Sequence, residues 1–398
     1  MAASAIGVVC GLIGTMFHFG VHEVTAFRGT HPWVLYLLPL AGFVIVSFYK
    51  LTETDGLGTD DIIDAVHEGK RLPILLLPAI FFGTVLTHLC GGSAGREGAA
   101  LQMGGTIGQC MGRTFRLDDR DLRVATLAGM AAFFSALFGT PLAATVFAIM
   151  VISIGVLYHV ALYPSLLAAL VAYGVSVRLG VEPTRFTVAV PDQSVGMFVR
   201  VAALGVLCAL VSILFCKLMH GAGHLMKRIK NPWLRVICGG FAVIALTWIF
   251  GTDYNGAGMD IVTRAIEQET VAVPWAFLLK LVFTAVTLAA GFKGGEVVPS
   301  FYIGATFGCA FGPLLGLPAG FSAAVGLVSV FCGATNTLIP SILLAYELFG
   351  GVGLELIALG CGVCYMLSGT HGLYSSQLFV TEKLLSEYTE SWGKRLRK

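Results

Sequence analysis

The chain has 398 residues, of which 56 % are hydrophobic and only 12 % are charged, and its mean hydropathy is +0.84. Soluble globular proteins carry about 25 % charged residues, so this composition excludes a soluble enzyme, a disordered regulator and a nucleic-acid binder. The formal net charge of +2 indicates no strongly acidic or basic partner.

The remaining charges are unevenly distributed. No Asp, Glu, Lys or Arg lies between Arg123 and Arg178, or between Glu296 and Glu347. Each stretch is far longer than one bilayer crossing of about 20 residues. We therefore predict an all-α polytopic membrane protein. The 50 glycines favour close helix packing and short, broken or re-entrant helices.

Apolar segments follow one another along nearly the whole chain. We expect helices over 3–26, 33–50, 72–90, 97–112, 124–138, 141–156, 158–178, 196–218, 233–250, 274–291, 298–314, 320–335, 339–349 and 354–369, and a last amphipathic helix over 374–389. The polar, Pro-containing segment 181–195 is interpreted as a linker. The predicted domains are therefore a first membrane repeat, 1–180, the linker, and a second membrane repeat, 196–398.

The two halves share a glycine pattern. In GGSAGREGAALQMGGTIG (91–108) and GFKGGEVVPSFYIGATFG (291–308), four glycines and one threonine recur 200 residues apart. Pro141 and Pro340 suggest a second match at an offset of 199. Transporters built from inverted-topology repeats carry their substrate site where broken helices of the two repeats meet.

Glu97 is the most informative residue, because it lies at membrane depth at the predicted start of a helix. A charged side chain there costs about 2.5–3.5 kcal/mol on insertion scales and usually serves an ion pathway or an ion pair. The N–H groups at a helix start, here around Arg96 and Gly98, bind anions. A protonatable carboxylate that competes with an anion for these groups can couple anion movement to proton movement. The alternative is a simple ion pair between Arg96 and Glu97.

Glu296 is a second acid at a predicted helix start, followed by Val297, Val298 and Pro299. Proline suits the first turn of a helix, where its missing N–H is not needed. The Glu296 side chain either caps this helix or takes part in proton transfer. The sequence does not decide between the two roles.

Two further segments are candidates for anion binding. In GLGTDD (56–61), Thr59 or Asp60 is expected to cap the helix that follows, and the amides near Leu57 and Gly58 can face an anion. Tyr374 carries a neutral hydroxyl donor, although it can equally be an interfacial aromatic residue.

Histidine pairs at helical spacing, His18 with His22 and His220 with His224, suit a metal ion. Neither pair has a third ligand in the sequence. We therefore expect no metal and no cofactor.

The four glycine-rich or tyrosine-containing segments together resemble the CLC family of chloride channels and transporters. GGSAGREGAALQMGGTIG is similar to its second signature, GGEVVPSFYIGATFG to its third, and GLGTDDIIDAVHEG and GLYSSQL to its first and to its central-tyrosine segment. The resemblance implies a homodimer with one pore per subunit, and we expect no C-terminal CBS domain. It also implies roles for Glu97 as the gating glutamate, for Tyr374 as the central tyrosine, and for the Val297 and Val298 amides in the anion site.

The departures from the chloride members point to one branch of the family. Leu57 replaces a serine, Ala99 a proline and Val297 a phenylalanine, while Val151 stands where proton-coupled chloride members carry an internal glutamate. These changes resemble the fluoride/proton antiporter branch, in which the acid matching Glu296 is characteristic. That branch often has Met at position 57 and Thr at position 298, which this chain lacks.

The resemblance thus implies a fluoride/proton antiporter, with a chloride/proton exchanger or a passive anion channel as alternatives. An intramembrane enzyme would need a Ser–His pair or a metal cluster at depth, and we find neither in the sequence. Four arginines in 113–123 and four basic residues in 393–398 predict cytoplasmic termini in the inner membrane under the positive-inside rule. The nearly neutral 27–32 connection is expected to face outward.

Overall fold

The computed structural model describes residues 1–271 and 273–379, and over these residues the chain is almost entirely helical. The first half contains α1 (Ala2–Thr30), η1 (Pro32–Leu37), α2 (Leu38–Leu51), α3 (Thr59–Glu68), α4 (Leu76–Leu89), α5 (Glu97–Thr114), α6 (Asp119–Phe138), α7 (Pro141–Met150), β1 (Ser153–Ile154), η2 (His159–Ala161) and α8 (Leu162–Arg178). The second half contains α9 (Val195–Met226), α10 (Pro232–Phe250), α11 (Met259–Glu267), α12 (Ala276–Ala290), α13 (Val297–Phe311), η3 (Gly312–Leu315), α14 (Ala319–Thr335), α15 (Leu338–Phe349), α16 (Leu354–Leu367) and β2 (Leu378–Phe379).

Seven helical segments in the described part of the chain are long and apolar enough to cross a membrane. Shorter apolar helices, among them α4, α7, α12 and α15, lie between them. Helices of this length do not span a bilayer alone and are tolerated where protein surrounds them. Long helices and short helices are therefore mixed along the chain, as the glycine content predicts.

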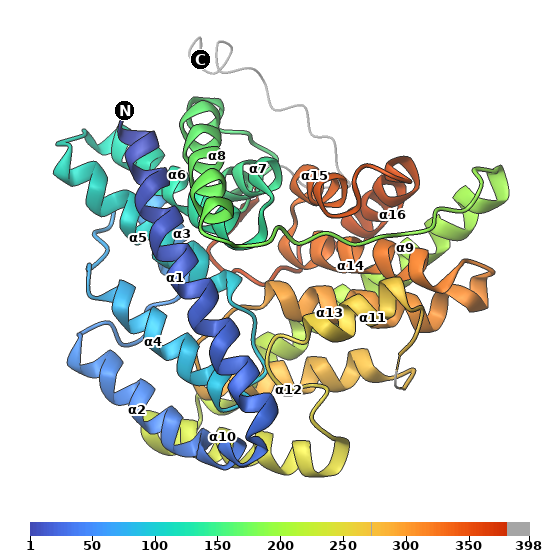
Figure 1. Ribbon diagram of the computed structural model, residues 1–398, viewed down its shortest axis with the longest axis horizontal. Coiled ribbons are helices and arrows are strands. Elements are labelled where there is room, and N and C mark those ends of the chain that lie inside the picture. Colours follow the sequence, from blue (N-terminus) through green and yellow to red (C-terminus); the bar gives the residue numbers. More distant parts are fainter. Residues whose placement is uncertain (272, 380–398) are drawn as a thin grey trace, which may run out of the picture.

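The two halves have matching orders of helices. Helices α3, α4, α5 and α6 begin 200 residues before α11, α12, α13 and α14 (Thr59 and Met259, Leu76 and Ala276, Glu97 and Val297, Asp119 and Ala319). Figure 1 shows the blue-to-green first half beside the orange and red helices of the second half, with the yellow α10 next to α2. Between the halves, residues 181–194 form neither helix nor strand.

Two equivalent helix crossings, between α5 and α6 and between α13 and α14, are very close. A Cβ on Gly104 would collide with the carbonyl oxygen of Gly129, and a Cβ on Gly304 with that of Gly326. Small residues permit such backbone contact between membrane helices. Part of the glycine surplus therefore builds these two equivalent crossings.

The repeat register after α6 differs from the proline match. Gly139 and Asn336 both end their helices in the left-handed conformation, and the N-caps that follow, Thr140 (φ −125°, ψ 70°) and Thr337 (φ −124°, ψ 80°), are nearly superimposable. The equivalent of Pro141 is therefore Leu338, at an offset of 197. The match to Pro340 was wrong, because backbone conformation rather than residue type fixes this turn.

The predicted boundaries fail at several further places, since α11 (Met259–Glu267) was not expected and α9 continues to Met226 instead of ending near residue 218. Helix α7 ends at Met150, and the next residues form β1, which pairs in parallel with β2. The amphipathic helix expected over 374–389 is wrong for 374–379, and its remainder lies outside the described residues. Gln377 Nε2 donates to the carbonyls of Val151 and Thr335, both at 2.9 Å, and these tertiary bonds hold the segment extended.

Candidate anion and proton site

The Glu97 carboxylate joins the starts of two helices. Glu97 is the first residue of α5 and is fully buried. Its Oε2 accepts hydrogen bonds from the backbone N–H of Arg96 (3.0 Å) and from that of Val298 (3.3 Å), in the first turn of α13. Free N–H groups and the helix macrodipole make this position favourable for negative charge. The carboxylate thus occupies an anion position made by one amide from each half.

The second oxygen of Glu97 is much less constrained. Oε1 lies 3.8 Å from Nε of Arg96 and accepts no hydrogen bond from the residues that the structure describes. The ion pair considered from the sequence therefore exists, but it is long. Glu97 therefore makes both contacts, with Arg96 through Oε1 and with the Val298 amide of α13 through Oε2.

Glu296 lies at the N-cap position of α13 but does not cap it with its side chain. The structure contains no side-chain cap hydrogen bond at this helix start, and Oε2, although buried, has no partner among the described residues. The carboxylate instead lies against the start of α5, since a Cβ on Gly98 would be 3.3 Å from Glu296 Oε2. Each acid therefore lies next to the helix start of the opposite repeat.

The N-terminus of α3 differs from the expected one. Its N-cap is Gly58, whose N–H donates to Asp61 Oδ2 at 2.8 Å, so neither Thr59 nor Asp60 caps the helix. Asp60 instead accepts a hydrogen bond from the N–H of Ser376 (3.2 Å). The carbonyl of Leu57 faces Nζ of Lys293 at 3.5 Å. The free amide at the start of α3 is therefore already hydrogen-bonded to Asp61, a carboxylate of the same helix.

Tyr374 is buried, and its hydroxyl has no hydrogen-bond partner in the described part of the chain. Tyr374 also lines a cavity of about 520 Å³ with Lys217, His220 and His371. A buried donor without a partner, at the edge of a basic cavity, can bind an anion.

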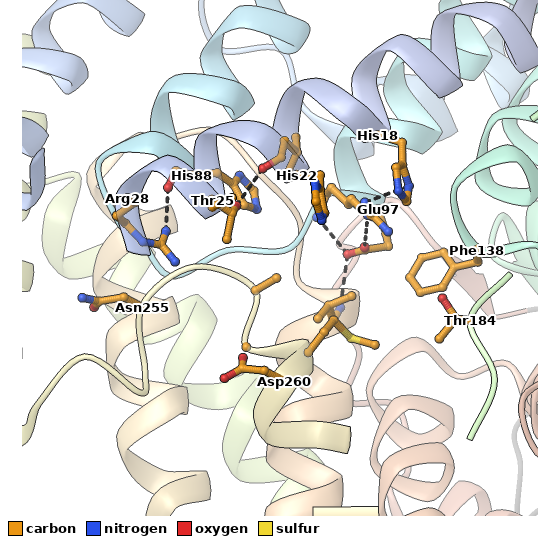
Figure 2. A pocket seen from close by; sticks show the side chains of 17 residues that line it. His18, His22, Thr25, Arg28, His88, Glu97, Phe138, Thr184, Asn255 and Asp260 are labelled. Carbon is orange, nitrogen blue, oxygen red and sulfur yellow. Dashed lines mark hydrogen bonds and ion pairs between the residues drawn. The ribbon is translucent and has the colours of Figure 1, made fainter. Parts of the chain in front are cut away.

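A second cavity, of about 420 Å³, reaches Glu97 and Val298. Figure 2 shows the Glu97 carboxylate among the lining residues, with His18 and His22 on one wall and Asn255 and Asp260 on another. The linings of the Glu97 cavity and the Tyr374 cavity share no residue. The site therefore has one cavity at Glu97 and another at Tyr374.

Sequence reasoning did not single out three basic residues that are buried or half-buried in the fold. Lys280 Nζ donates to the carbonyls of Tyr254 (3.2 Å) and Gly256 (2.6 Å), and Lys293 Nζ lies 4.1 Å from the ring centre of Tyr49. In α1, Arg28 Nη1 donates to the carbonyl of His88 at 2.6 Å. An isolated lysine inside the apolar stretch 276–290 is a signal that could have identified Lys280.

The fold and this site define a polytopic membrane protein of a transport family. The family model for the voltage gated chloride channel matches residues 40–369. The chain therefore belongs to that family, the CLC family, which consists of channels and transporters rather than enzymes.

Among individual relatives, the chloride/fluoride channel protein of Pseudomonas syringae pv. tomato is 39 % identical over 387 residues, which cover 94 % of this chain and 85 % of that protein. The H(+)/Cl(-) exchange transporter ClcA of Vibrio vulnificus is 26 % identical over 423 residues, which cover 96 % of this chain and 89 % of that protein. The crystal structure of a CLC-type fluoride/proton antiporter matches with a TM-score of 0.92 at 34 % identity over 95 % of this chain and 97 % of that one. A slow cyanobacterial Cl-/H+ antiporter matches in fold, with a TM-score of 0.78 at 20 % identity over 92 % and 93 % of the two chains.

Proposed function

We propose that this protein is a fluoride/proton antiporter that exports fluoride in exchange for protons. The observation that carries the proposal is the position of the Glu97 carboxylate, which accepts hydrogen bonds from the Arg96 and Val298 amides. A solved CLC-type fluoride/proton antiporter is 34 % identical and covers nearly the whole chain, whereas the chloride exchangers compared above are 20 % and 26 % identical.

Competition between the carboxylate and the anion supplies the coupling. When Glu97 takes up a proton, its neutral side chain loses the charge that favours the helix start. It then leaves, and the two amides become available to a fluoride ion. When the proton is released, the carboxylate returns and displaces the anion. One proton and one anion thus alternate at one position.

Glu296 is proposed as the second proton-carrying group. Chloride members use an internal glutamate that corresponds to Val151 here, and Val151 is fully buried and cannot titrate. Glu296 is half-buried, its buried Oε2 has no partner among the described residues, and it lies against Gly98 beside the start of α5. It is therefore suited to exchange a proton near Glu97.

The remaining site residues are proposed to guide the anion between the cavities. The Tyr374 hydroxyl and the Val297 and Val298 amides are donors along this path. Leu57 and Gly58 form its wall at α3, where an anion has to compete with Asp61 for the Gly58 amide. Arg96 and Gly98 form the helix start beside Glu97.

We further propose a homodimer with one pore per subunit, in the inner membrane, with cytoplasmic termini. A cavity lined by Met1, Leu117 and Asp121 brings the N-terminus next to the arginine-rich segment 113–123, which supports a common side for both. The basic tail 393–398 lies outside the described residues. The Glu97 cavity, lined by the C-terminal part of α1, then faces outward.

Flux measurements on proteoliposomes test the proposal. Vesicles are prepared with equal fluoride or equal chloride concentrations inside and outside, with and without a pH gradient, and anion movement is followed with ion-selective electrodes. Uphill fluoride movement driven by protons is expected, with much slower chloride movement. Faster chloride exchange would favour the chloride/proton exchanger, and fluoride flux that never runs uphill would favour a passive channel.

A further inference from the structure

The Glu97 cavity contains a histidine that contacts the same arginine as the gating carboxylate. Arg96 Nη1 lies 3.1 Å from His18 Nδ1, while its Nε faces Glu97 Oε1 at 3.8 Å. The second terminal nitrogen, Nη2, is 3.5 Å from the carbonyl of Leu137. The guanidinium therefore lies between an imidazole on α1 and the carboxylate on α5.

The chemistry of this contact fixes the protonation state of the ring. Arginine has no acceptor and stays protonated in proteins, so His18 Nδ1 must be the acceptor. The ring is then neutral and carries its proton on Nε2. A second proton on His18 would remove the acceptor and bring two positive charges together. The Arg96–His18 hydrogen bond therefore exists only while His18 is neutral.

We propose that His18 is a positioning residue that controls how firmly Arg96 holds the Glu97 carboxylate, and that protonation of His18 from the cavity slows transport. With neutral His18, the guanidinium is shared between the ring and the carboxylate. With protonated His18, Arg96 loses the ring and is repelled toward Glu97, which stabilises the carboxylate in its closed position. This inference rests on the proposed function, because it assigns a control to the same gate.

The other charged groups around His18 do not substitute for this contact. On α1, the His22 ring is stacked at 6.5 Å and its nearest acid is the exposed Glu23. On the other walls, Arg28 is bonded to the His88 carbonyl, and Asp260 pairs with Arg264.

His88 donates through Nδ1 to the Thr84 carbonyl at 2.8 Å, if its proton is on that nitrogen. Its Nε2 has no hydrogen-bond partner among the described residues. The acid that pairs with Arg96 is Glu97. A change in charge at His18 is therefore transmitted to the gate through Arg96.

The test compares His18→Asn with the wild type in fluoride efflux at equal pH on both sides of the vesicle. The Asn Oδ1 replaces Nδ1 as an acceptor but does not titrate. As the pH falls from neutral to below about 5, the variant-to-wild-type rate ratio is expected to rise, because a histidine beside a positive charge takes up its proton at lower pH than a free one. A rise of about fivefold in this ratio corresponds to the net free energy of one hydrogen bond.

His22→Asn is the matched control, since it removes a histidine from the same helix and the same cavity without touching Arg96. Its rate ratio is expected to stay constant with pH. A constant ratio for His18→Asn, or an equal rise for His22→Asn, would overturn the inference. Thermal unfolding in detergent shows whether each variant is folded, and His18→Gln provides a second non-titrating acceptor if His18→Asn is not.

The outcome for His18 is separable from that for the proposed function. If wild-type vesicles conduct fluoride but never move it uphill, antiport fails while the pH-dependent ratio still reports on His18. If wild-type vesicles move fluoride uphill and the ratio is constant, only the inference about His18 fails.

Discussion

Gly95 and Gly295 exchange both of their backbone hydrogen bonds, with N–H to carbonyl distances of 2.8 Å in each direction. Residue i bonds to j and j bonds back to i, which is the pattern that a two-fold axis between equivalent segments produces. This bridge brings the starts of α5 and α13 together. It is the reason why Glu97 can reach the Val298 amide, 201 residues further along the chain.

Replacing the gating acid should separate anion movement from proton movement. Glu97→Gln has almost the same shape but cannot carry a proton or a negative charge. We expect proton-driven uphill fluoride transport to be abolished, as measured with fluoride and pH electrodes on proteoliposomes. Uphill pumping by Glu97→Gln or Glu97→Ala would contradict the role assigned to Glu97.

Glu347→Gln serves as the control for this experiment. Glu347, in α15, is another buried acid whose carboxylate faces the start of a different helix. It accepts hydrogen bonds from the amides of Leu142 (3.0 Å) and Ala143 (2.9 Å) of α7. Its loss should cost about 1–3 kcal/mol of stability but should leave the proton-to-fluoride ratio unchanged.

Glu296→Gln tests the second acid. Because the Glu296 side chain caps no helix in the structure, its replacement should change proton flux more than stability. We expect fewer protons per fluoride in simultaneous electrode recordings, and a melting temperature close to that of the wild type. An unchanged ratio would leave Glu296 without a role in proton transfer.

The backbone bridge should be intolerant of a side chain. In Gly295→Ala, the new Cβ would lie 2.9 Å from Gly98 Cα and 3.2 Å from the Glu97 nitrogen. Such overpacking costs about 1–3 kcal/mol, and the α5 and α13 starts should move apart. Tryptophan-fluorescence melting in detergent is expected to show the loss, and fluoride transport should fall with it.

Gly174→Ala is the matched substitution for that experiment. Gly174 lies within α8 and a Cβ there would meet nothing within 4 Å. In a helix interior, alanine in place of glycine stabilises by about 0.5–1 kcal/mol. If both variants melted alike, close contact at the bridge would not be what requires glycine at position 295.

Tyr374→Phe should weaken anion binding without unfolding the protein. The hydroxyl has no protein partner among the described residues, so its removal leaves no buried group unsatisfied. A lost hydrogen bond to the anion is expected to lower fluoride affinity about fivefold, as measured by the concentration dependence of efflux.

Tyr49→Phe controls for the loss of any buried hydroxyl, because the Tyr49 hydroxyl is also without a partner in the described chain while its ring lies next to Lys293. We expect its affinity for fluoride to match the wild type. An equal loss of affinity in both variants would argue against a direct contact between Tyr374 and the anion.

The sequence alone determined the class of the protein, its repeat and its two candidate acids. Low charge and regular apolar segments are properties of the chain itself, and so is the recurrence of glycines 200 residues apart. Because few charges are left at membrane depth, Glu97 and Glu296 could be selected without a structure.

The tertiary structure decided which groups each acid meets. That Glu97 accepts from Val298, that Glu296 lies against Gly98 without capping its own helix, and that Arg96 contacts His18 all depend on packing between distant segments. The same holds for residues 374–379, whose local pattern favoured a helix but whose bonds to Val151 and Thr335 hold them extended. Local sequence sets where helices form, whereas contacts between residues far apart in the chain set the chemistry of the site.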